Sequence, residues 1–193
     1  MSIGKNGVWK HSGSPNPNIF PEAQSSEVQY VYPTTGTYKD YLSKQTSIIP
    51  SSSQYTLSFY AKSTVNGDKI RSHYYNPNTT TTCVSSQGVN KTAADGNMDF
   101  TLTTEWIKYW VTYTQTETTA KKWIIFPRLM VGGGTGTISV KEVKFEEGPV
   151  ATDWIPCEGD NLYVGAFHSF IEKEEKTRIQ KNDYIEANSF IEL

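Results

Sequence analysis

Alternation between apolar and polar residues is the dominant pattern of this chain, and it predicts β-strands rather than helices. The alternation is clearest over residues 55–62 and 107–114. The side chains predicted to face a core on these two segments are Tyr55, Leu57, Phe59, Ala61, Ile107, Tyr109, Val111 and Tyr113. Thr, Ser, Lys and a few aromatic residues alternate with them, so each segment is expected to lie in a sheet with one buried face.

Shorter extended segments are predicted at 28–32, 38–49, 70–75, 80–85, 123–130 and 138–146. Pro127 lies inside one of them and has no backbone N–H to donate, which predicts an edge strand or a bulge. The apolar residues change parity between Val140 and Val143, which predicts a β-bulge near Lys141 and Glu142. Residues 86–99 are polar and contain glycine, so we expect a long loop there.

These roughly eight or nine short strands, separated by Gly, Pro and Asn, predict an all-β fold for residues 1–157. Such spacing is typical of two antiparallel sheets packed face to face as a sandwich.

Residues 158–193 have a different character, because an aromatic residue followed by Ile and Glu recurs within them. A helix over 164–181 fits the spacing of its apolar residues, whereas the triplets and the turn at Asn182 favour short strands. So short a segment cannot bury a core of its own, and we expect it to pack on the sandwich or on further copies of the chain. The candidate oligomer contacts are Phe170, Ile171, Tyr184, Ile185, Phe190 and Ile191.

Composition and charge narrow the function classes. The chain has 193 residues and a net charge of −2, which does not favour electrostatic binding of nucleic acid. Aromatic residues make up 13%, which fits pleated, half-buried surfaces. No apolar run approaches the roughly 18 residues that would span a bilayer, so membrane insertion is not predicted. Cys83 and Cys157 lie far apart and are interpreted as free thiols in preference to a disulfide.

The sequence predicts no catalytic residue, no metal and no cofactor. Its three histidines have no metal-ligand spacing, and no Gly-x-Ser-x-Gly nucleophile elbow occurs. The glycine run at 132–134 lacks the Gly-Lys-Ser/Thr of a phosphate-binding loop. Asp95, Asp99 and Glu105 cluster in sequence, and we interpret them as solvated loop charges.

Two stretches resemble a known family. Residues 54–62, followed by 103–109, resemble the jelly-roll carbohydrate-binding modules of the family 4/9/22 type. The closing stretch 138–148, with Ala151-Thr152-Asp153-Trp154-Ile155-Pro156 after it, looks more specifically like versions found in bacteriophage tail and baseplate proteins. The resemblance covers residues 1–157, and the last six residues are similar to the C-terminal ends of phage fibre proteins.

The resemblance implies an antiparallel jelly-roll β-sandwich with a short C-terminal extension. It implies one sheet from 28–32, 55–62, 107–114 and 138–146, and a second, concave sheet from 38–46, 70–75, 80–85 and 123–130. Enzyme-linked members often hold a structural calcium through an Asp pair in the last strand. Lys141 and Glu142 occupy that place here, so no metal is carried over.

A glycan site on the second sheet follows from the same resemblance. If Ile70, Ser72 and Tyr74 face inward on one strand, and Trp123, Ile125 and Leu129 on another, five residues line the ligand face. They are Arg71, His73, Tyr75, Phe126 and Arg128. Aromatic rings stack on a pyranose and guanidinium groups bind paired hydroxyls, although the same residues could simply stabilise the sheet through cross-strand contacts.

The resulting hypothesis is a virion protein of a phage tail, fibre or capsid surface that adheres to a host cell-surface polysaccharide. A homotrimer held by the tail would supply avidity to a weak sugar site, and other virion proteins would be its further partners. Two alternatives stay open. The fold could be virion architecture without a ligand, or it could be the binding module of a polysaccharide-degrading enzyme.

Overall fold

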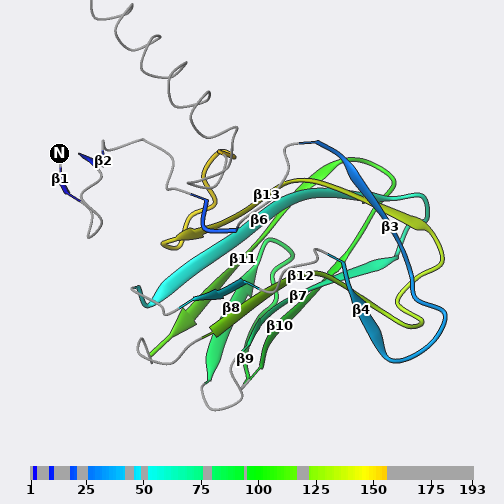
Figure 1. Cartoon of the computed structure of the whole chain (residues 1–193), viewed down its shortest axis with the longest axis horizontal. Coiled ribbons are helices and arrows are strands. Elements are labelled where there is room, and N and C mark those ends of the chain that lie inside the picture. Colours follow the sequence, from blue (N-terminus) through cyan, green and yellow to red (C-terminus); the bar gives the residue numbers. More distant parts are fainter. Residues whose placement is uncertain are drawn as a thin grey trace, which may run out of the picture.

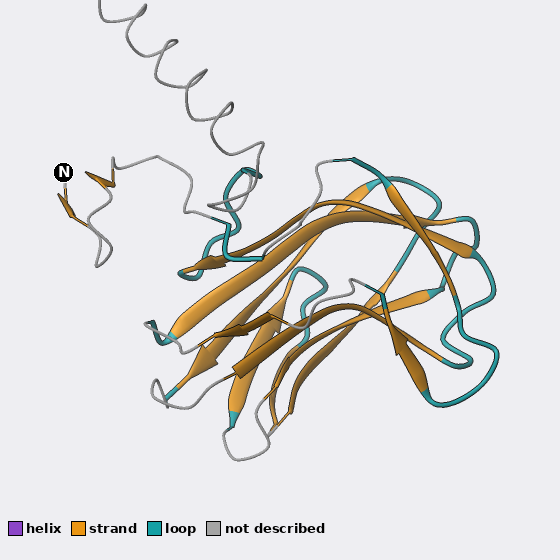
Figure 2. Ribbon diagram, in the orientation of Figure 1, coloured by secondary structure: helices purple, strands orange, loops and turns teal. Residues whose placement is uncertain are grey.

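The described part of the chain consists of strands and loops. The computed structural model describes residues 18–20, 26–41, 52–75, 80–93, 95–116 and 122–155, and the backbone of strands at 2–3, 9–10 and 46–48. Figure 2 shows no helix among these residues, and accordingly none that could cross a membrane. The C-terminal segment 158–193, with its six candidate oligomer contacts, and Cys157 lie outside the described residues.

Two antiparallel sheets form the body of the fold and stack as two layers (Figure 1). The six-stranded sheet has the order β3 (Val28–Val31), β13 (Thr137–Glu147), β6 (Gln54–Ser63), β11 (Ile107–Gln115), β8 (Thr81–Ser85) and β9 (Asn90–Ala93). The five-stranded sheet has the order β10 (Asp95–Thr101), β7 (Lys69–Tyr75) and β12 (Lys122–Met130), with β4 (Tyr38–Asp40) and β5 (Thr46–Ile48) both pairing with β12. A separate pair joins β1 (Ser2–Ile3) to β2 (Trp9–Lys10).

The order of the strands is that of a jelly roll. From β6 to β13 the chain crosses from one sheet to the other at every step except the β8–β9 hairpin. Each crossing places consecutive strands in opposite layers, so both inner faces contribute to one core. The predicted all-β antiparallel jelly-roll sandwich is confirmed.

Aromatic side chains fill the space between the sheets. The Phe59 ring lies 4.3 Å from that of Phe126 and 5.2 Å from that of Phe100, centroid to centroid, and these contacts join the two layers. The predicted inward residues of β6 and β11 are buried, except that Ile107 is 40% exposed at the start of its strand. Burying each large side chain contributes about 1.5–3 kcal/mol, so this cluster is the main source of stability.

Two sequence expectations about the strands were wrong. Residues 86–99 hold β9 and most of β10 rather than one long loop, and Met98 is buried in the core from β10. The segment 81–85 pairs with β11 in the six-stranded sheet, and β10 takes the place beside β7. The alternation of β10 is hard to recognise in the sequence at Gly96, because this buried position carries no apolar side chain.

The predicted bulge in the closing strand is confirmed. The register between β13 and β6 shifts between Lys141 and Lys144, and Glu142 has a φ of 53°. Val140 before the shift and Val143 after it therefore both face the core. The same shift turns Lys144 and Glu146 to the outer face of the sheet, where they form a buried ion pair.

The glycine-rich turn before β13 is built around Asp68. Its buried carboxylate accepts hydrogen bonds from the Thr135 and Gly136 backbone N–H groups at 3.1 and 2.9 Å, and from the Ser63 hydroxyl at 2.6 Å. A Cβ placed on Gly134 would collide with the Asp68 carboxylate and would lie 2.6 Å from the Tyr32 ring. Glycine is thus required here by close approach rather than by a phosphate ligand.

Candidate functional site

The predicted ligand residues of β7 lie together on the outer face of the five-stranded sheet. Ile70 and Tyr74 are buried in the core, and the Ser72 hydroxyl lies 2.7 Å from that of Tyr113 in the opposite sheet. Because side chains alternate along a strand, Arg71, His73 and Tyr75 face the other way. The inward and outward residues of this strand are as predicted.

On β12 the predicted orientation was wrong at Trp123, Ile125 and Phe126, and right at Leu129. The register between β7 and β12 shifts between Ile125 and Arg128, so the alternation changes phase across Phe126 and Pro127. Phe126 points into the core, with 1% of its surface exposed, and Trp123 faces outward beside Tyr75. Pro127 lies at a bulge, which is one of the two positions predicted for it. The other, an edge strand, is not observed, because β12 lies inside the sheet.

We call the resulting surface the β7–β12 face, defined by Arg71, His73, Tyr75, Trp123 and Arg128. Cross-strand pairing brings these residues together, since Trp123 is opposite Tyr75, and Arg128 is opposite Arg71. Tyr75 and Trp123 are partly exposed, with ring centroids 6.4 Å apart, and the His73 ring lies 5.1 Å from that of Tyr75. The β7–β12 face therefore places the tilted rings of His73, Tyr75 and Trp123 beside the charged groups of Arg71 and Arg128.

The charged row consists of two guanidinium groups, each held by a carboxylate. Arg71 binds Asp99 through Nε and Nη2 at 2.5 and 2.7 Å, and Arg128 binds Asp40 through Nε and Nη2 at 2.7 and 3.0 Å. The hydrogen bond from Arg71 is the main reason that the pKa of Asp99 lies below its usual value. Such forked pairs fix donors and acceptors in one plane.

Arg128 is held further by two neighbours and is almost completely buried. Its Nη1 lies 2.7 Å from His73 Nδ1, and its guanidinium carbon lies 3.9 Å from the centroid of the Tyr38 ring. Only 8% of the surface of Arg128 and of His73 is exposed. These contacts are the cross-strand stabilisation that the sequence left open as an alternative to binding, so the exposed part of the face consists chiefly of Tyr75, Trp123 and Arg71.

The outer face of the other sheet carries a second arrangement, which the sequence did not reveal as a site. Residues 148–155, which we call the return segment, fold back over β6, β11 and β13. The Thr56 and Thr112 hydroxyls donate to the backbone carbonyls of Gly148 and Pro149 at 2.7 and 3.1 Å. The segment therefore begins on two adjacent strands of the sheet.

Thr152 attaches the return segment to the buried Lys144–Glu146 pair. The Lys144 ammonium donates to the Thr152 hydroxyl at 2.5 Å and to the Asp153 carbonyl at 2.7 Å. The Thr152 hydroxyl and backbone N–H donate to the two Glu146 carboxylate oxygens at 2.6 and 2.8 Å. Burial lowers the pKa of Lys144, and the Glu146 charge opposes that shift.

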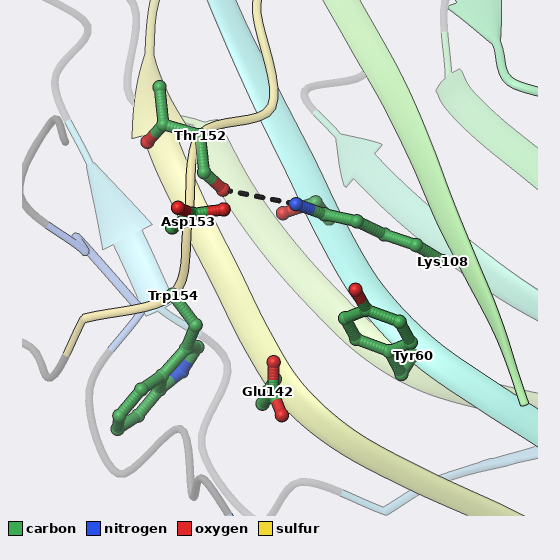
Figure 3. Close-up of a pocket in the computed structure, with 7 residues that line it drawn as sticks. Tyr60, Lys108, Glu142, Thr152, Asp153 and Trp154 are labelled. Carbon is green, nitrogen blue, oxygen red and sulfur yellow. Dashed lines mark hydrogen bonds between the residues drawn. The ribbon is translucent and has the colours of Figure 1, made fainter. Parts of the chain in front are cut away.

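A cavity of about 310 Å³ lies between the return segment and the sheet. Figure 3 shows Tyr60 and Lys108 on one side of it and Thr152, Asp153 and Trp154 on the other. Ser58 and Glu142 complete the lining. The Trp154 indole N–H donates to the Val143 carbonyl at 3.0 Å, which fixes the ring at the cavity wall.

The described residues contain no group of three or more His, Cys, Asp or Glu side chains that could hold a metal ion. Cys83 is buried in the core and forms no disulfide with another described residue. Asp99 and Glu105 do not gather into one site, since Asp99 binds Arg71 on β7 while Glu105 is exposed in the loop after β10, and the side chain of Asp95 lies outside the described residues.

No family model matches the chain, and no curated protein matches it. Several solved structures are similar. A tripod from the baseplate of bacteriophage Tuc2009 shares 16% identity, covering 76% of this chain and 60% of that one, with a TM-score of 0.41. The enzymatically active domain of bacteriophage CBA120 tailspike protein 4 shares 11%, covering 67% of this chain and 21% of that one, with a TM-score of 0.38.

A xylan-binding domain from Paenibacillus barcinonensis shares 10% identity, covering 67% of this chain and 99% of that one, with a TM-score of 0.30. The similar structures thus include phage tail proteins and carbohydrate-binding modules. At these identities and TM-scores, the similarity does not carry an assignment of function to this chain.

Proposed function

We propose that this chain is a non-enzymatic component of a bacteriophage tail or fibre whose jelly-roll module adheres to a glycan on the host surface. The sugar-binding part of this proposal rests on the β7–β12 face, where partly exposed Tyr75 and Trp123 lie beside guanidinium–carboxylate pairs. Rings provide an apolar platform for a pyranose, and fixed donors and acceptors select its hydroxyls. The tail or fibre location is supported by the resemblance of residues 138–148 and 151–156 to phage tail and baseplate sequences.

The experiment is a binding measurement with the full chain and purified host cell-wall polysaccharide. Trp123→Ala and Tyr75→Ala should each weaken binding about tenfold or more, because each removes one ring of the platform at a cost of about 1.4 kcal/mol. Val84→Ala is a matched control, since Val84 is exposed on the six-stranded sheet and contributes nothing to this face. Unchanged binding by both ring variants, with an intact fold, would overturn the site.

Virion architecture without a ligand is the second candidate function, and one observation favours it. Arg71 and Arg128 are each already bound to a carboxylate within the sheet, as a purely structural role would require. Replacing Arg71, His73 and Tyr75 together would separate the two functions. Unchanged host adsorption by particles that carry the folded triple variant would support architecture, and lost adsorption would support the glycan site.

The absence of catalysis is part of the proposal and has its own test. The full chain should release no reducing sugar from host polysaccharide under conditions in which it binds. Release of reducing sugar that increases with time and with protein concentration would overturn the non-enzymatic assignment. It would favour a polysaccharide-degrading protein.

A further inference from the structure

The cavity beneath the return segment has the composition of a binding site rather than of a packing defect. Voids left by imperfect packing are apolar, whereas this one is lined by one lysine, two carboxylate residues, two aliphatic hydroxyl residues and two aromatic residues, namely Lys108, Glu142, Asp153, Ser58, Thr152, Tyr60 and Trp154. A space of about 310 Å³ lies at the small end of ligand sites, which suits one sugar ring rather than a chain of them.

Two residues on the return-segment side of the cavity are held in place by hydrogen bonds to groups outside its lining. Trp154 is fixed through its indole N–H to the Val143 carbonyl, and Thr152 is fixed by the buried Lys144–Glu146 pair. Glu142 is placed by the bulge in β13, where its backbone is left-handed. A rigid site loses little conformational freedom when a ligand enters, so even a small ligand can be held.

The charges of the lining indicate which ligands fit. Lys108 is the one cation among the lining residues, and its ammonium already donates to the Thr152 carbonyl at 3.3 Å. Glu142 and Asp153 give two carboxylates, which disfavour a further carboxylate or phosphate. Carboxylate acceptors beside the Tyr60 and Trp154 rings instead suit a neutral polyhydroxylated ring.

We propose that this cavity binds one sugar residue that carries no negative charge, as a second site on the opposite side of the sandwich from the β7–β12 face. The ligand class rests on the proposed function, but the two sites share no residue. Tyr60 and Trp154 contact the sugar ring, and Glu142, Asp153 and Lys108 bind its hydroxyls. The hydroxyl of Ser58, on the sheet between β11 and β13, forms the floor.

The test is a ¹H–¹⁵N spectrum of the full chain titrated with methyl glycosides of glucose, galactose, N-acetylglucosamine and glucuronic acid. The indole signals of Trp154 and Trp123 report the cavity and the β7–β12 face separately. A neutral glycoside should shift the Trp154 signal with a Kd on the order of millimolar, and methyl glucuronide should bind about tenfold more weakly.

Single-residue variants test the cavity and the β7–β12 face independently of each other. Tyr60→Ala should abolish the shift of Trp154, and Trp123→Ala should leave it unchanged. Lys62→Ala is the matched control, because Lys62 lies two residues from Tyr60 on the same face of β6 but outside the lining. Glu142→Gln should reduce the discrimination against the glucuronide while the return segment stays in place.

The outcomes separate the two proposals. A shift of Trp123 without any shift of Trp154 overturns the cavity site and leaves the proposed function standing. A shift of Trp154 alone overturns the β7–β12 face and leaves the cavity site standing, and no shift of either signal overturns both. Tighter binding of the glucuronide than of every neutral glycoside overturns the assignment of an uncharged ligand.

Discussion

Asp68 shows how a single residue can determine a loop. Three donors converge on its carboxylate, and two of them are backbone N–H groups of the turn at 132–136. The composition of that turn follows from Asp68, because side chains on Gly134 or Gly136 would occupy the space of the carboxylate. This turn also determines where β13 begins, and β13 is the longest strand of the six-stranded sheet.

Asp68→Ala should destabilise the fold by about 3 kcal/mol or more, because it leaves buried backbone donors without an acceptor. Urea unfolding measures the change. Glu105→Ala, at an exposed loop position, should change the free energy of unfolding by no more than about 0.5 kcal/mol. Equal stabilities of the two variants would contradict the role given to Asp68.

Asp99 provides a pH-dependent test of the charged row. The Arg71 hydrogen bond is the largest cause that holds the pKa of Asp99 below 3.8, and Arg71→Gln should therefore raise it in a carboxyl NMR titration. A carboxyl with a lowered pKa contributes stability that is present above its ordinary pKa and lost as pH falls through the folded-state pKa. Arg71→Gln should thus lose less stability on acidification than the wild type, while Lys62→Ala, on the other sheet, should leave the Asp99 titration unchanged.

At the scale of elements, the period-2 pattern predicted those strands in which every inward position carries an apolar side chain. The segments 55–62 and 107–114 are of this kind, and their faces could be assigned from the sequence. The pattern failed where parity is ambiguous. Ile124, Ile125 and Phe126 are consecutive apolar residues, so the alternation alone could not locate the shift that buries Phe126 and exposes Trp123.

The candidate sites were predictable to different degrees. Arg71, His73 and Tyr75 lie on one regular strand, so their common face followed from alternation. The cavity depends on where the chain runs after it leaves β13, which no local pattern specifies. The one available signal was Thr152-Asp153-Trp154 following the Gly148-Pro149 turn, a polar and aromatic group directly after a strand.

The attachment of the return segment rests on the buried Lys144–Glu146 pair. Lys144→Met alone should cost about 3–5 kcal/mol, because it leaves the Glu146 carboxylate buried without its cation. Lys144→Met combined with Glu146→Gln should be more stable than the single variant, since the amide is neutral and its oxygen can still accept from Thr152. Urea unfolding gives both values, and a double variant less stable than the single one would count against the pair.

The same pair predicts an alkaline pH effect. The folded-state pKa of Lys144 lies below 10.5, so between that pKa and 10.5 the unfolded chain holds a proton that the folded chain has lost. The penalty for burying the ammonium is fully present below the folded-state pKa and is relieved as pH rises toward 10.5. The free energy of unfolding of the wild type should therefore rise relative to that of Lys144→Met as pH increases through this range.

At the scale of the whole molecule, the two proposed sugar sites face away from each other on opposite sheets. Several copies on one particle could then contact different parts of a polysaccharide layer. Weak sites gain from such multiplicity, since linked binding can exceed single-site affinity by about 10²–10⁴-fold. This is the physical reason for proposing an oligomer.

The full chain should therefore be a homotrimer in solution, with three times the 21.7 kDa mass of one chain by light scattering. Phe170→Ser combined with Phe190→Ser should shift the mass toward a single chain, because it removes two of the candidate contacts in the C-terminal segment. Val150→Ser, at an exposed position of the return segment, is the control. A wild-type chain that stays monomeric would remove the avidity argument.

The return segment also determines how the domain would bear a mechanical load. A pull on residues beyond 155 reaches the return segment before it reaches β13. Thr152 and Trp154 would then be peeled from the sheet one attachment after another, whereas the sandwich strands beneath would stay paired. The hydrogen bonds from Trp154 to the Val143 carbonyl and from Thr152 to the buried Lys144–Glu146 pair would break in that order and re-form when the tension is released, while the pair itself stays on β13.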